Sequence, residues 1–112
     1  MSQEAIELSD LSEVVRAADL VAFQPGSVIS RTIVKKPTGT VTAFAFDAGE
    51  GLSEHTAPFD AMVMNLEGEA EISVAGTPHH LTAGDIIMLP AGHRHAVKAV
   101  TPFKMLLIMI KA

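Results

Sequence analysis

The chain after residue 26 is divided by turn-forming residues into short runs of β-forming residues, and this pattern limits the folds open to it. The turns read PTG, EG, AGTP, AGD, PAG and TP, and the runs between them are rich in Val, Ile, Thr and Phe. The expected strands cover residues 27–34, 39–46, 61–66, 70–74, 79–81, 85–89, 95–100 and 104–110. Many short strands at this spacing predict an all-β protein, built as an antiparallel sandwich or barrel.

The amino-terminal stretch IELSDLSEVV, residues 6–15, has a different pattern. It predicts an entry strand followed by a short helix. Ser9 or Asp10 can cap that helix, and Glu13 follows Asp10 at the spacing of a capping box.

The length of the chain suits a single domain with one buried core. We therefore expect one domain over residues 1–112, divided into an arm of about residues 1–25 and a barrel of about residues 26–112.

Composition and charge argue against several classes of function. The chain has no cysteine, so disulfides and thiolate chemistry are excluded, and any metal must be held by nitrogen and oxygen. Eight basic residues scattered over a chain of net charge -5 provide no surface for nucleic acid. The amino terminus lacks the pattern of a secretory signal, which predicts a cytoplasmic protein. The apolar run at 105–110 is too short to span a bilayer, so no membrane partner is expected.

The apolar content predicts a second copy of the chain as a partner. Hydrophobic residues make up 48% of the chain, and its mean hydropathy is +0.33. Residues 61–66 and 104–110 are apolar on both faces, so each strand needs cover on both sides. The barrel interior can cover one face, and we expect a two-fold homodimer, formed partly by the amino-terminal strands, to cover the other.

Two stretches have the spacing of a known pair of motifs. Five residues separate Gly49 from His55, and Gly68 closes this first stretch. In the second, Gly84 is followed at fixed intervals by the residues Pro90, Gly92 and His95. Together the stretches resemble the signatures of the cupins, and the chain is similar to the small single-domain, RmlC-like members. The resemblance implies a jelly-roll β-barrel, and the capping pattern described above adds a short amino-terminal helix to it.

The resemblance also implies a metal site that is incomplete in this chain. His55 and His95 match the first and third histidines of the cupin motifs, but Ala57 stands in place of the second histidine and Ala61 in place of the glutamate. Both signatures match in order, although the second ends in Ala99 where the family has asparagine. We expect the two imidazoles to converge from opposing walls of the barrel.

Two imidazoles bind a divalent cation weakly unless a third ligand joins them. The candidates are Asp60, which a bulge near Pro58 could turn inward, and His93, two residues before His95. The cation would be Zn, Ni, Mn or Fe.

Three further polar residues stand in expected strands. By alternation Asn65 shares a face with Ala61 and Val63, so it either satisfies itself inside the barrel or contacts a ligand. We include it with His55 and His95 in the expected ligand pocket. His79 and His80 are expected to be surface or partly buried strand residues.

Three hypotheses of function follow from these observations. The first is a cupin that binds a small molecule in its barrel pocket, directly or through a weakly held metal. The second, by family resemblance, is a metal-dependent enzyme such as a dioxygenase, isomerase or lyase. The third is a structural or regulatory dimer without chemistry.

Overall fold

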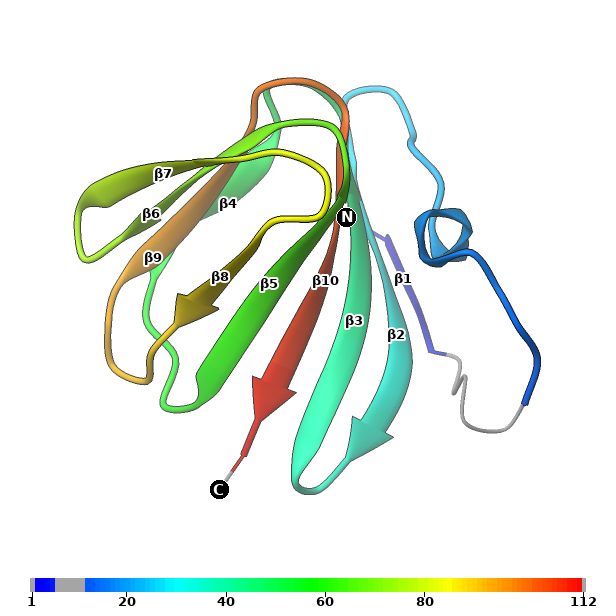
Figure 1. The fold of residues 1–112 in the computed structure, drawn as a ribbon, viewed down its shortest axis with the longest axis horizontal. Helices are drawn as coiled ribbons and strands as arrows, with labels where there is room; N and C mark the ends of the chain where they lie inside the picture. Colours follow the sequence, from blue (N-terminus) through cyan, green and yellow to red (C-terminus); the bar gives the residue numbers. More distant parts are fainter. Residues whose placement is uncertain (1, 6–11, 112) are drawn as a thin grey trace.

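The computed structural model describes residues 2–5 and 12–111, which form two β-sheets facing each other across an apolar core (Figure 1). The described strands are β1 (Ser2–Ala5), β2 (Val28–Lys36), β3 (Gly39–Phe46), β4 (Gly51–His55), β5 (Asp60–Glu67), β6 (Ala70–Val74), β7 (Thr77–Leu81), β8 (Ile86–Leu89), β9 (His95–Ala99) and β10 (Phe103–Ile110). One short 3-10 helix, η2 (Ala17–Leu20), lies in the arm before the barrel.

The order of the strands is that of a jelly roll. One sheet has the order β1-β2-β3-β10-β5-β8, and the other has the order β4-β9-β6-β7. Apart from β1, which runs parallel to β2, the paired strands are antiparallel. After β3 the chain crosses to the other sheet at every connection except that between β6 and β7, which are neighbours in the four-stranded sheet. The all-β jelly-roll fold predicted from the sequence is confirmed.

The core lies between the two sheets and is built by strict alternation along the strands. In β5, Ala61, Val63 and Asn65 are buried, whereas the residues between them are half-buried on the other face. Phe46 stacks on Phe103 with ring centroids 5.4 Å apart. Each such side chain contributes about 1.5–3 kcal/mol when it is removed from water, so this interior holds the sheets together.

The arm covers part of the outer face of the six-stranded sheet. A second apolar cluster forms there from Val21, Ile33, Ala43 and Ala45. Lys104 fixes the arm by donating a hydrogen bond from Nζ to the carbonyl oxygen of Ala18, at 2.7 Å. Figure 1 shows the arm and η2 beside β1 and β2, on the opposite side of the molecule from the four-stranded sheet.

The prediction for the amino-terminal stretch differs from the structure where the two can be compared. Residues 6–11, with the expected caps Ser9 and Asp10, lie outside the described residues. Residues 12–15 have no regular secondary structure, and the helical turn begins later, at Ala17. Val14 and Val15 are exposed, so this stretch has no apolar face to hold a helix against the barrel. In residues 2–5 and 12–111, no helix has the length and apolar character needed to cross a bilayer.

Candidate functional site

His55 and His95 meet at one end of the four-stranded sheet. Their Nε2 atoms are 3.1 Å apart, and their rings are 4.4 Å apart at an angle of 71°. The two residues are direct cross-strand partners on the neighbouring strands β4 and β9. The predicted convergence is therefore present, but the two rings come from one wall of the barrel and not from opposing walls. His95 is only 7% exposed, whereas His55 is exposed. The pair therefore lies at the boundary between the protein interior and solvent.

A β-bulge in β4 places His55 next to His95. Leu52 is opposite Val97 and His55 is opposite His95, so two residues of β4 stand against one residue of β9. Leu52 and Val97 belong to the core, and without the extra residue Glu54 would take the inward place beside His95. Glu54 instead lies 3.5 Å from Arg94, with both side chains about half exposed. This ion pair holds both side chains at the surface, away from the two imidazoles.

Backbone carbonyl groups fix the orientation of both rings. The Nδ1 of His55 lies 2.8 Å from the carbonyl oxygen of Ser53, and the Nδ1 of His95 lies 3.2 Å from that of His93. A carbonyl oxygen only accepts hydrogen bonds, so each Nδ1 carries the hydrogen and each neutral ring presents a lone pair at Nε2. Two lone pairs therefore face each other at 3.1 Å, an arrangement that a cation between them would stabilise.

Burial disfavours a proton as the cation between the two rings, because it disfavours the charged form of His95. Desolvation lowers the pKa of His95 from its usual 6.5, the nearby charge of His55 lowers it further, and the hydrogen bond to the His93 carbonyl opposes this in part. Near neutral pH the ring of His95 is thus kept in the uncharged form, which is the form that ligates metal ions.

The spacing of the pair suits a metal ion. Two nitrogens that take adjacent positions on one ion, at about 2.0–2.1 Å each, lie roughly 2.8–3.4 Å apart. The observed 3.1 Å falls within this range. Hydrogen bonds from Nδ1 to carbonyl oxygens are also the usual support for metal-binding histidines. The residues present therefore fit a cation with two protein ligands.

The structure does not add a third ligand to the pair. Among the described residues there is no group of three or more His, Cys, Asp or Glu side chains that could hold a metal. Asp60 instead accepts a hydrogen bond at Oδ1 from the backbone N–H of Ala91, at 2.9 Å. His93 is exposed and contributes its carbonyl oxygen to the orientation of His95. Asp60 and His93 thus both have a role in the loop beside the site, and a role for either as third ligand stays a prediction.

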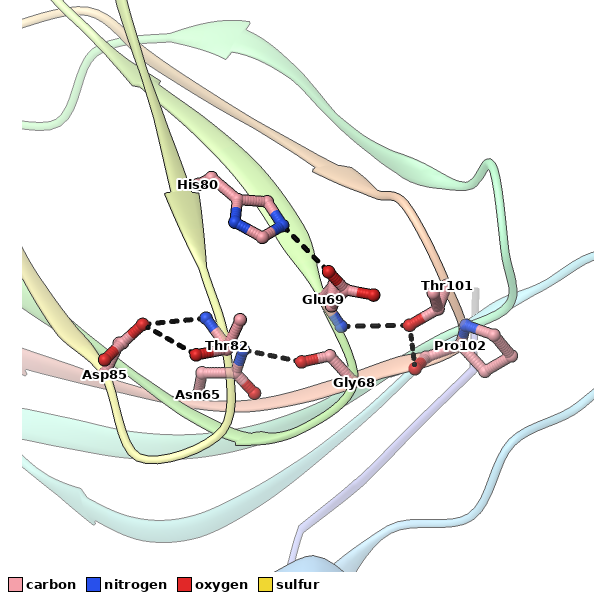
Figure 2. A network of polar contacts seen from close by, with 8 residues as sticks. All are labelled: Asn65, Gly68, Glu69, His80, Thr82, Asp85, Thr101 and Pro102. Atoms are coloured by element: carbon pink, nitrogen blue, oxygen red, sulfur yellow. Dashed lines mark hydrogen bonds and ion pairs between the residues drawn. The ribbon is translucent and has the colours of Figure 1, made fainter.

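Asn65 faces inward as alternation predicts, but its side chain serves a turn. It is 1% exposed, and Nδ2 donates a hydrogen bond to the carbonyl oxygen of Gly68 at 2.9 Å (Figure 2). Its backbone also binds the loop before β8, through Gly84 and Asp85. Gly68 has φ of +82°, and a Cβ there would overlap the carbonyl oxygen of Pro102, so the turn needs glycine. Asn65 supports this turn, and within residues 2–5 and 12–111 no hydrogen bond joins it to either histidine of the pair.

The histidines of β7 lie on opposite faces of the four-stranded sheet. His80 stands opposite Glu71, and its Nε2 is 3.0 Å from Oε1 of Glu69 (Figure 2). His79 stands opposite Ile72, a fully buried core residue, and so lies on the inward face of the sheet. The buried Leu81, two residues after His79, was the sequence signal for this orientation.

Comparison with known proteins identifies the family. The sequence pattern of the family described as "Cupin domain" matches residues 43–110, which include both histidines of the pair. The chain belongs to the cupin family. No match is found among curated protein sequences.

Several solved cupin-fold structures are similar to this cupin. A conserved protein of unknown function from Streptococcus pyogenes is 35% identical, with 90% of this chain and 89% of that chain covered and a TM-score of 0.86. A cupin superfamily protein from Desulfitobacterium hafniense is 28% identical, with coverage of 90% and 93% and a TM-score of 0.86. A cupin 2 conserved barrel domain protein from Leptotrichia buccalis is 41% identical, with coverage of 84% and 46% and a TM-score of 0.81. These relatives establish the family and the fold.

Proposed function

We propose that this cupin binds a small molecule at the end of its barrel, through a divalent cation held by His55 and His95. The observation that carries the proposal is the pair of Nε2 atoms facing each other at 3.1 Å, with both Nδ1 atoms committed to carbonyl oxygens. Zn, Ni, Mn and Fe all accept imidazole ligands. Such a cation supplies a Lewis acid that binds the oxygen atoms of a ligand.

The alanines of the degenerate motif support binding through open positions. Ala57 and Ala61 bring no donor atom where a fuller site would have a histidine and a glutamate. A cation held by two protein nitrogens keeps more positions for ligand oxygen or water than one held by three. The floor of the site is apolar, because Leu52 and Val97 form the next cross-strand pair below the histidines.

Binding is favoured over catalysis by the way the nearby carboxylates are used. Glu54 is paired with Arg94 on the outer face, and Asp60 accepts a hydrogen bond from Ala91. Neither carboxylate is placed to act as a general acid or base on a ligand at the pair. We therefore rank a metal-dependent enzyme below a binding protein and keep it as the alternative hypothesis.

Metal uptake tests the proposal directly. Protein freed of metal with a chelator is dialysed against Ni²⁺, Zn²⁺, Mn²⁺ or Fe²⁺ and analysed for metal content. We expect near-stoichiometric uptake of at least one ion by the native protein and its loss in His55→Ala and in His95→Ala. His80→Ala is the matched control, because His80 pairs with Glu69 on the outer face, and its uptake should equal that of the native protein. Failure of the native protein to take up any of the ions would reject the proposal.

We also propose a homodimer, formed through the outer face of the six-stranded sheet. Ile86, Met88 and Ile110 are 56%, 50% and 61% exposed there. They extend a face on which Met62 stands opposite both Met88 and Ile108 on the neighbouring strands. Exposed apolar surface of this kind marks an interaction site, and a second copy offers the same surface in return.

Light scattering after size exclusion tests the dimer. We expect twice the 11.8 kDa mass of the chain for the native protein, and the single mass for Met88→Glu. Val100→Glu is the matched control, because Val100 is 53% exposed at the end of β9 in the other sheet. A native protein of single mass, or a Met88→Glu variant of double mass, would contradict this interface.

A further inference from the structure

A cleft opens between the edge strands of the two sheets. It has a volume of about 390 Å³ and lies between β7, the last strand of one sheet, and β8, the last strand of the other. Figure 1 shows these two strands at the same side of the barrel. We call it the β7–β8 cleft. Its volume is in the range of sites that hold small organic molecules.

The cleft begins next to the histidine pair, on the neighbouring strand of the four-stranded sheet. Val74 lines the cleft, and Val74 is also the cross-strand partner of His95. His79 lines the cleft from the next strand, opposite Ile72. From His95 to His79 the path crosses two strand spacings and two residues of rise, which amounts to about 12 Å between α-carbons. One molecule of that length can therefore reach from the pair into the cleft.

The chemistry of the cleft favours an apolar molecule with one polar contact. Most of its lining is apolar, with the inward-facing residues Val74, Leu81 and Ile87 among those that contribute. Two of its three titratable side chains are already engaged. Asp85 accepts hydrogen bonds from Thr82 at the turn, and His80 pairs with Glu69 (Figure 2).

The remaining titratable group of the cleft is the imidazole of His79. It lies on the inward face of the sheet and is exposed. Among the described residues it makes no hydrogen bond or ion pair. A neutral imidazole can donate from one nitrogen and accept at the other. His79 is therefore suited to a hydroxyl group at the far end of a ligand.

We propose that the β7–β8 cleft holds the apolar body of the ligand, and that His79 binds a hydroxyl group at its far end. The ligand class is an arylalkanoic acid, with a carboxylate head at the cation, a ring in the cleft and a distal hydroxyl. This inference rests on the proposed function, because the head needs the cation held by His55 and His95. It adds a specificity-determining residue, His79, that the metal site does not require.

A series of three acids tests each part of the ligand separately. The probes are acetate, 4-phenylbutyrate and 4-(4-hydroxyphenyl)butyrate, titrated calorimetrically into the Ni²⁺-loaded protein. We expect 4-phenylbutyrate to bind at least about tenfold more tightly than acetate, because its ring leaves water. The hydroxyl group should add about fivefold more through His79.

Two variants identify the contact. His79→Ala should remove the gain from the hydroxyl group while leaving Ni²⁺ uptake and acetate affinity unchanged. His80→Ala should keep that gain, because His80 lines the cleft but its Nε2 is already paired with Glu69 at 3.0 Å.

The outcomes separate this inference from the metal proposal. Normal Ni²⁺ uptake with equal affinity for all three acids would overturn the cleft and leave the metal site in place. Normal uptake with an unchanged hydroxyl gain in His79→Ala would overturn the role of His79. Unchanged binding of 4-phenylbutyrate by metal-free His55→Ala would overturn the position of the head. An absence of Ni²⁺ uptake would instead reject the proposed function on which the inference rests.

Discussion

Replacing Asn65 tests whether its buried amide supports the turn between β5 and β6 or serves a ligand. In the structure Nδ2 donates to the carbonyl oxygen of Gly68 at 2.9 Å, and the side chain is 1% exposed. Asn65→Ala removes this donor and leaves a small void beside the turn. Asn65→Asp keeps the shape but replaces the donor by a second acceptor, and it places a charge in the core.

The expected costs follow from these contacts. A buried carbonyl deprived of its donor costs about 1–3 kcal/mol, so the free energy of unfolding of Asn65→Ala should fall by about 2 kcal/mol. An unpaired buried carboxylate costs about 3–5 kcal/mol, so Asn65→Asp should lose more. For a domain of this size, each kcal/mol lowers the melting temperature by roughly 4–8 °C. Because burial raises the pKa of a carboxyl group, Asn65→Asp should regain part of its loss as the pH falls toward 5.

Urea unfolding followed by circular dichroism measures these values. Glu71→Ala is the matched control, because Glu71 is an exposed residue on the outward face of β6 and should change stability by less than about 0.5 kcal/mol. An Asn65→Ala variant as stable as the native protein would refute the structural role of the amide. A loss in Asn65→Asp no larger than that in Asn65→Ala would refute the argument from buried charge.

Three further predictions concern the surroundings of the histidine pair. Stability should decrease as the pH falls through 6.5, because the unfolded chain takes up a proton that the lowered pKa of His95 denies to the folded state. Urea midpoints between pH 8 and pH 5 should show a smaller decrease in His95→Asn, and equal decreases would contradict the assignment. Gly51→Ala should lower both the melting temperature and the metal affinity, because the added Cβ overlaps the carbonyl oxygen of Val97 and pushes β4 away from β9. Ser53→Ala is the control and should change neither value, because the side chain of Ser53 is exposed in the same strand. Glu54→Gln should change the free energy of unfolding by less than about 1 kcal/mol, because the ion pair with Arg94 is half exposed. A larger loss by chemical denaturation would mean that this pair supports the bulge.

The strands of the barrel could be predicted where alternation and turn residues act together. Residues 39–46 and 70–74 are strands with the predicted bounds, since each is flanked by a glycine turn. Residues 70–74 bury one face, whereas the second half of 39–46 is buried on both faces. β4 was absent from the predicted strands, although it carries His55. It is an edge strand of five residues in which only Leu52 is partly buried, so it has too little apolar alternation to be recognised.

The candidate site could be predicted in its members but not in its geometry. Motif spacing selected His55 and His95, and the structure brings these two together. Their position on adjacent strands depends on the pairing of β4 with β9, which links residues about forty positions apart and leaves no local signal. Asn65 was assigned to the pocket because alternation gives the face of a side chain but not its hydrogen-bond partner. That partner, Gly68, is only three residues away.

The bulge in β4 means that the strand encodes two alternative donor sets. With the extra residue accommodated as observed, an imidazole stands beside His95. A regular pairing continued from Leu52 would present the carboxylate of Glu54 at the same place, on an edge strand where a change of register disturbs few neighbours. The extra residue of the bulge would then decide whether a nitrogen or an oxygen donor stands beside His95. Nitrogen donors suit softer cations and oxygen donors suit harder ones. If a cation binds at this pair as proposed, a change in the length of β4, and not only a change of side chain, would alter which ion the barrel prefers.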